Sequence, residues 1–240
     1  MRLNWFNKDE WREFWIVAFV FAFILSFNDW GAKTFSLGTG LMNLFVAFVI
    51  TTVSLLVHHF GQRLYAARKG IQAEQRVWWP GLIIGLILVI FSNGAVKFFA
   101  ATALFVHHVA AARVGRYFHA LTDRTIGASA LMGPLFSIVF AVAIKTFQNL
   151  FAPGWLLADK IFMFNVSFAL FSMLPIPPLD GSRVFFASRA LYAFTFGAAA
   201  GYFILSQLFQ LYSIWWSLAI GAVFGLIFYL LYERGAWKWP

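Results

Sequence analysis

The stretch "NVSFALFSMLPIPPLDGSRVF", residues 165–185, decides the fold because it joins an apolar run to a proline cluster and an Asp-Gly pair. The apolar run predicts a membrane helix. The three prolines must end that helix, since proline lacks a backbone N–H and clashes with the preceding turn. Asp180 then falls at membrane depth or at its edge, where an ionisable residue is expensive and points to function. The alternative is a helix-exit turn with an aspartate cap.

The composition of the whole chain is that of an integral membrane protein. The 240 residues are 62% hydrophobic and 20% aromatic, and only 11% are charged. A bilayer-spanning helix needs about 17 to 25 mostly apolar residues. Six segments qualify: residues 14–30, 41–60, 128–150, 160–178, 192–212 and 214–232. The sequence therefore predicts an all-α polytopic membrane helix bundle with about six transmembrane helices.

Residues 81–109 depart from this pattern. Two short apolar pieces, GLIIGLILVIF and VKFFAATALFV, are interrupted by Ser92, Asn93, Gly94 and Lys97. Short pieces of this kind predict a re-entrant hairpin buried against protein, and two thin membrane spans are the alternative. Residues 71–79 can form a short strand at the membrane edge.

The charge distribution favours a membrane role over nucleic-acid binding. The formal net charge is +9, but the basic residues occupy short tracts between apolar runs, where topology and anionic lipid headgroups explain them. Their bias predicts a multi-pass protein of the cell membrane with both termini in the cytoplasm. The charged first residues predict no removable signal peptide. The chain has no cysteine, so disulfides and thiolate metal sites are excluded.

A second stretch, "LLVHHFGQRLYAARKG" (residues 55–70), resembles a degraded metal motif. In H-E-x-x-H, two histidines one helical turn apart bind one zinc ion and the glutamate activates the metal-bound water. Here His58 keeps the first position, His59 replaces the glutamate and Gln62 replaces the second histidine. Taken alone, this pattern also fits a water-facing helix end.

With both stretches in view, the sequence resembles the site-2 protease family of intramembrane zinc metalloproteases, in its small archaeal or bacterial form. HHFGQRLYAARKGIQAEQRVWWPGL is similar to the family's H-E-x-x-H helix and the stretch that follows it. MGPLFSIV is similar to the G-P-x-x-N helix, and FSMLPIPPLDGSRVF to the N-x-L-P-x-x-P-L-D-G motif. The resemblance implies one domain over residues 1–240. A core over residues 41–190 follows an N-terminal helix in 1–40 and precedes a helical pair in 191–240.

The resemblance also implies a site. The zinc ligand positions correspond to His58, Gln62 and Asp180, and the general-base position to His59. A further set of positions lines the substrate groove. These are Gly133, Pro134, Ser137, Asn165, Ser172, Pro175, Pro178 and Gly181.

Four of these positions depart from the family pattern. Gln62 offers zinc only a neutral amide oxygen, His59 removes the carboxylate base, and Ser137 and Ser172 replace asparagines. These losses favour a catalytically impaired pseudoprotease that binds or regulates transmembrane helices of other proteins within the lipid membrane. One alternative is an active zinc endopeptidase in which His107, His108 or His119 replaces the missing ligand. The other is a structural subunit of a membrane protein complex.

Overall fold

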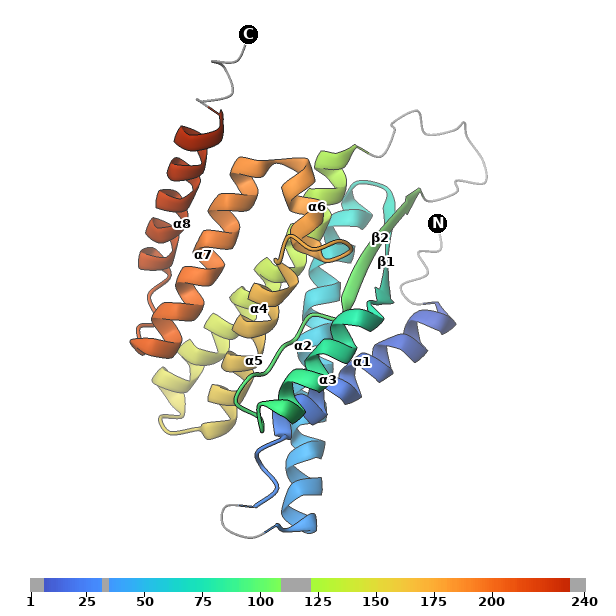
Figure 1. The fold of residues 1–240 in the computed structure, drawn as a ribbon, viewed down its shortest axis with the longest axis vertical. Helices are drawn as coiled ribbons and strands as arrows, with labels where there is room; N and C mark the ends of the chain where they lie inside the picture. The colour runs from blue at the N-terminus through green and yellow to red at the C-terminus, as the bar shows by residue number, and fades with distance from the viewer. Residues whose placement is uncertain (1–6, 32–34, 109–121, 234–240) are drawn as a thin grey trace.

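The computed structural model describes residues 7–31, 35–108 and 122–233, and helices dominate it (Figure 1). The elements are listed here in chain order. They are α1 (Lys8–Ser26), α2 (Leu37–Arg68), β1 (Ile71–Val77), α3 (Trp79–Phe91), β2 (Thr102–His108), α4 (Asp123–Phe151), α5 (Leu156–Ser172), α6 (Asp180–Ala187), α7 (Arg189–Leu208), α8 (Ile214–Phe228) and a π-helical turn, η1 (Tyr229–Glu233).

Local sequence fixes where several helices begin. At α1, Asn7 and Glu10 form a capping box, in which each side chain accepts a hydrogen bond from the other residue's backbone N–H. Thr122 and Ser188 cap α4 and α7 by accepting from backbone N–H groups three residues on. The proline cluster follows the end of α5 as the sequence predicts.

The bundle centre is formed by α4, which packs closely against α2, α5 and α6. Gly61 lets α2 approach α4, because a side chain at this position would meet Phe136 and the Met132 backbone. Buried aromatic rings fill the space between α1 and α5, where Phe21, Phe164 and Phe168 pack edge to face or stacked. Helix α1, α3 and the strands lie on one side of this centre, and α7 and α8 lie on the other (Figure 1).

The strands β1 and β2 form a two-stranded antiparallel sheet, in which Ile71 pairs with His108 and Val77 with Thr102. The strand expected within residues 71–79 is therefore present. The intervening chain leaves the sheet as α3 and returns extended. Gly81 and Gly85 allow close packing against the backbone of that returning segment, at residues 98–100. Only the first of the two apolar pieces in 81–109 is helical, so the second is an extended return and a strand.

Four helical segments are long and apolar enough to cross a membrane: Leu37–Arg68, Asp123–Phe151, Arg189–Leu208 and Ile214–Tyr232. The expected count of six is not confirmed. Helix α1 carries five charged residues in its first two turns, and α5 has only 17 residues. Both helices are nevertheless apolar over most of their length and pack into the core.

The G-x-x-x-G pattern in α8 packs inside the chain. Gly221 lies against Phe194 and Ala198 of α7, and Gly197 of α7 lies against Phe224. Small residues on both helices therefore bring α7 and α8 together, as such motifs do within membranes. Most other side chains of α8 are exposed.

Candidate functional site

His58 and Asp180, 122 residues apart in the sequence, meet in the interior of the bundle. Both side chains are buried, and His58 Nε2 lies 3.0 Å from Asp180 Oδ2. The other ring nitrogen, Nδ1, lies 3.0 Å from Ser137 Oγ. When Asp180 is ionised its carboxylate only accepts, and in that state Nε2 donates to Asp180 and Nδ1 accepts from the Ser137 hydroxyl. Both ring nitrogens of His58 are thus engaged by protein groups.

Asp180 owes its position to the turn between α5 and α6. It is the first residue of α6, and the next residue, Gly181, packs against the Met173 carbonyl where a side chain would not fit. Pro175 and Pro178 lie in the turn itself. Burial raises the pKa of the Asp180 carboxyl above its usual value, and the hydrogen bond from His58 opposes this shift. Its Oδ1 has no hydrogen-bond partner among the described residues.

Gln62 lies one helical turn after His58 and is fully buried. Its Nε2 is 3.4 Å from His58 Nε2 and 3.5 Å from the Ala130 carbonyl. Its Oε1 accepts a hydrogen bond from Gln75 Nε2 of β1. The amide oxygen, which is the atom that could bind a metal ion, is therefore used to connect α2 with the sheet.

Helix α4 closes the other side of this cluster. Gly133 faces the pair formed by His58 and Gln62, and a side chain there would collide with the His58 ring and come within 2.7 Å of Gln62 Nε2. Pro134 is accommodated inside α4 beside it. Ser129 donates to the Gln62 backbone carbonyl at 3.2 Å. The Gly-Pro pair of the sequence motif thus gives α4 its close approach to α2.

His59 points elsewhere, because adjacent helical residues diverge by about 100°. Its ring packs edge to face on Phe14 of α1, at 5.8 Å between ring centres. It is 3% exposed, and neither ring nitrogen has a hydrogen-bond partner among the described residues. His59 lines a small cavity between α1, α2 and the sheet. The residue at the general-base position is therefore buried on the α1 side of α2.

Two further predicted groove residues are buried, and one of them links α5 to α2. Asn165 donates from Nδ2 to Ser54 Oγ and to the Ile161 carbonyl, both at 2.8 Å. Ser172 donates to the Ala169 carbonyl at 3.0 Å. Neither bonds His58 or Asp180 directly. Their role in a groove stays a prediction.

Gln75 is the participant that sequence reasoning missed. It lies within the stretch similar to the family's, but the motif positions surround it without including it. Its side chain is buried because alternate residues of β1 face the core. Gln75 can be identified only by its hydrogen bond to Gln62, and that contact is visible only in the folded structure.

The donor set does not fit a zinc site. Zinc in proteins takes three or four ligands from histidine, cysteine and carboxylate side chains. Here His58 and Asp180 supply two, and the Gln62 oxygen is engaged by Gln75. Within residues 7–31, 35–108 and 122–233, no three histidine, aspartate or glutamate side chains are placed to bind one ion.

Of the three histidines predicted as replacement ligands, only His107 has a described side chain, and it contacts Glu74 rather than the His58–Asp180 pair. His107 lies on β2 with its Nε2 3.4 Å from Glu74 Oε2, and it is 58% exposed. His108 is the last residue of β2, and its side chain is outside the described part of the structure. His119 lies outside the described residues.

Comparison with known proteins gives one similarity. No protein-family model and no solved structure matches the chain. A protein of Methanocaldococcus jannaschii, whose name assigns it provisionally to the zinc metalloproteases, is 29% identical over 182 residues. The alignment covers 75% of this chain and 84% of that protein. The chain is thus similar, over most of both lengths, to a protein named as a zinc metalloprotease, and this similarity supports a metalloprotease-type membrane protein.

Proposed function

We propose that this chain is a site-2-protease-like membrane protein that has lost peptide hydrolysis and instead binds or regulates transmembrane helices of other proteins. One observation carries the proposal. His58 and Asp180 lie in contact in a buried site, whereas the third ligand position, Gln62, directs its oxygen to Gln75. Two of the three predicted ligand positions are therefore in contact, and the oxygen at the third is engaged by Gln75.

The missing general base supports the same proposal. A positioned base contributes typically about 10²- to 10⁴-fold to catalysis. The residue at that position, His59, packs on Phe14 and faces the cavity beside α1. A neutral histidine could accept a proton, but none of the described contacts directs this ring toward Asp180.

The membrane arrangement belongs to the same proposal. Beyond the four candidate spans, α1 and α5 complete six crossings, and α3 with its extended return enters and leaves the membrane on the side of the sheet. Both termini then lie in the cytoplasm, as the basic residues favour. The exposed apolar side chains of α8, including Trp215 and Trp216, face lipid or the helices of partner proteins.

An active zinc endopeptidase is the second candidate, and the similarity to the M. jannaschii protein favours it. In that case Gln62 would rotate its amide to release Gln75, and a further group would join His58 and Asp180. The two candidates predict opposite metal contents.

Metal analysis of the purified full-length chain separates them. We expect the zinc content to remain far below one ion per chain, and to be the same in the wild type and in His58→Ala. One zinc ion per chain that disappears in His58→Ala would establish the endopeptidase. Asp123→Ala, an exposed acid at the start of α4, is the matched control for unspecific binding.

A restoration experiment tests the scaffold. The double variant His59→Glu with Gln62→His rebuilds the motif, and cleavage of a single-span substrate helix is followed with added zinc. We expect no cleavage by the wild type. Cleavage by the double variant would show that a glutamate at position 59, which faces α1 in this structure, can turn to serve the restored site. His59→Glu alone is the control, because it restores the base while leaving Gln62 in place. Cleavage by the wild type would contradict the proposal.

A further inference from the structure

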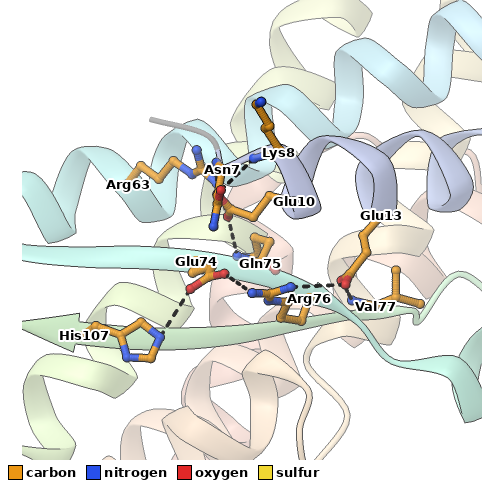
Figure 2. A network of polar contacts seen from close by, with 10 residues as sticks. All are labelled: Asn7, Lys8, Glu10, Glu13, Arg63, Glu74, Gln75, Arg76, Val77 and His107. Atoms are coloured by element: carbon orange, nitrogen blue, oxygen red, sulfur yellow. Dashed lines mark hydrogen bonds and ion pairs between the residues drawn. The ribbon is translucent and has the colours of Figure 1, made fainter. Parts of the chain in front are cut away.

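The outer edge of β1 is covered by side chains of α1. One edge of β1 pairs with β2, which leaves the backbone N–H groups of Gln75 and Val77 on the other edge. Gln75 N donates to Glu10 Oε1 and Val77 N donates to Glu13 Oε2, both at 2.8 Å (Figure 2). Two carboxylates therefore take the place of the carbonyl groups of a third strand.

The two acids and the two N–H groups face each other. Glu10 and Glu13 are three residues apart, so they project from the same face of α1. Gln75 and Val77 are two residues apart, so their N–H groups leave the same edge of β1. One face of the helix therefore supplies acceptors to one edge of the strand.

Two arginines, one on α2 and one on β1, also contact these acids. Arg63 NH2 lies 2.6 Å from Glu10 Oε1, and Arg76 NH1 lies 3.3 Å from Glu13 Oε1. Arg76 also pairs with Glu74, which lies beside His107 (Figure 2). The first two turns of α1 are thus attached to the sheet by directional, charged contacts.

The rest of α1 is attached differently. Phe21 and Ile24, toward its C-terminal end, are fully buried in the aromatic core. Apolar packing of this kind extends back to Phe14, which is buried in the same core, whereas residues 8–13 are attached through the charged contacts of Glu10 and Glu13. The start of α1 and its remainder are therefore attached by different kinds of contact.

A cavity lies beneath the charged contacts. It is lined by Glu10, Glu13 and Phe14 of α1, by Leu55 and His59 of α2, and by residues of both strands that include Thr102. His59 is buried in its wall with both ring nitrogens lacking a hydrogen-bond partner among the described residues. Buried polar rings normally have a hydrogen-bond partner, and a water molecule or another group that enters this cavity can reach the ring nitrogens of His59.

We propose that the first two turns of α1 form a latch, in which Glu10 and Glu13 bind the edge of β1 and their release opens the cavity beside His59. This inference deepens the proposed function and rests on it, because it identifies what controls entry of a partner segment. Its test requires neither zinc nor a partner, so the latch and the proposed function can fail independently.

The chain has no cysteine, so a single introduced cysteine reports on its own surroundings. Thr102→Cys places a thiol in the cavity wall, where Thr102 is 5% exposed. Ala141→Cys places one in the buried contact of α4 with α5 and α7, away from α1. Labelling by N-ethylmaleimide is followed by mass spectrometry for each reporter in the full chain in detergent.

Each reporter is combined with Glu13→Ala, which removes the acceptor for Val77 N–H without touching the capping box at Asn7. We expect Thr102→Cys to label about tenfold faster with Glu13→Ala, because the open state gains population when a charged hydrogen bond is lost. The rate at Ala141→Cys should not change. Asp9→Ala is the matched control, since Asp9 is an exposed acid on the same helix.

Three outcomes would overturn the latch. The first is an unchanged rate at Thr102→Cys with Glu13→Ala. The second is an equal rise at Ala141→Cys, which would mean that Glu13 holds the whole fold together rather than a local cover. The third is an equal rise with Asp9→Ala, which would indicate a general effect of charge.

Discussion

Helix α2 buries two pairs of polar residues, His58 with Gln62 and His59 with Arg63. The pairs are offset by one residue along the helix and face different surroundings. His58 and Gln62 face α4 and α6, and their polar atoms bond Asp180, Ser137 and Gln75. His59 and Arg63 face α1 and the sheet, where Arg63 pairs with Glu10 and the His59 ring lacks a hydrogen-bond partner in the described structure. On the first face the polar side-chain atoms of His58 and Gln62 all have partners, whereas the second face borders a cavity. The comparison shows that the two adjacent histidines serve different parts of the molecule.

The largest expected loss of stability comes from removing the carboxylate that contacts His58. Asp180→Ala leaves the buried His58 ring without its carboxylate and should lower the free energy of unfolding by about 3 kcal/mol. Reversible unfolding in mixed detergent micelles measures this difference. Asp123→Ala, also an acid in the first turn of a helix but exposed, should cost less than about 1 kcal/mol. Equal losses would mean that the buried contact adds no stability.

A smaller effect is expected from crowding the same face. Gly133→Ala places a methyl group against His58 and Gln62 and should cost about 1 to 3 kcal/mol. The control is Gly38→Ala near the start of α2, where nothing lies within 4 Å of the added atom. Thermal unfolding followed by circular dichroism compares the two variants. A Gly133→Ala protein as stable as the control would show that α4 can move away from α2.

The smallest effect comes from the experiment that compares the two faces of α2 most directly. The same histidine-to-phenylalanine substitution is made at two neighbouring positions. His59→Phe removes two unpaired ring nitrogens and keeps a ring against Phe14, so it should stabilise the fold by up to about 1 kcal/mol. His58→Phe should destabilise it, since Asp180 and Ser137 each lose a partner. The same unfolding measurement serves both. A loss of stability in His59→Phe would reveal a contact to that ring.

The sequence predicts the helical, membrane-type architecture because hydrophobic run lengths and a proline-terminated helix are local signals, and it also predicts a strand within residues 71–79. The proximity of His58 and Asp180 is instead implied by the resemblance to the site-2 protease family. The predicted count of six spans is not confirmed, because α1 begins with charged residues and α5 is short. The Gln62–Gln75 bond and the carboxylates on β1 could not be predicted, because they depend on how α1, α2 and β1 pack. Metal binding at His58, Gln62 and Asp180 stays a prediction.

The pairing of Val77 with Thr102 has a consequence for how this chain can vary. The two residues are neighbours across the sheet, so the chain segment between them leaves the sheet and returns to it at the same place. A change in the length of this segment leaves the strand register intact when its two ends stay paired, and its cost falls on the core contacts of Leu82, Val89 and Phe99. Relatives can therefore differ in the size of this segment while α2, α4 and α6 keep their positions.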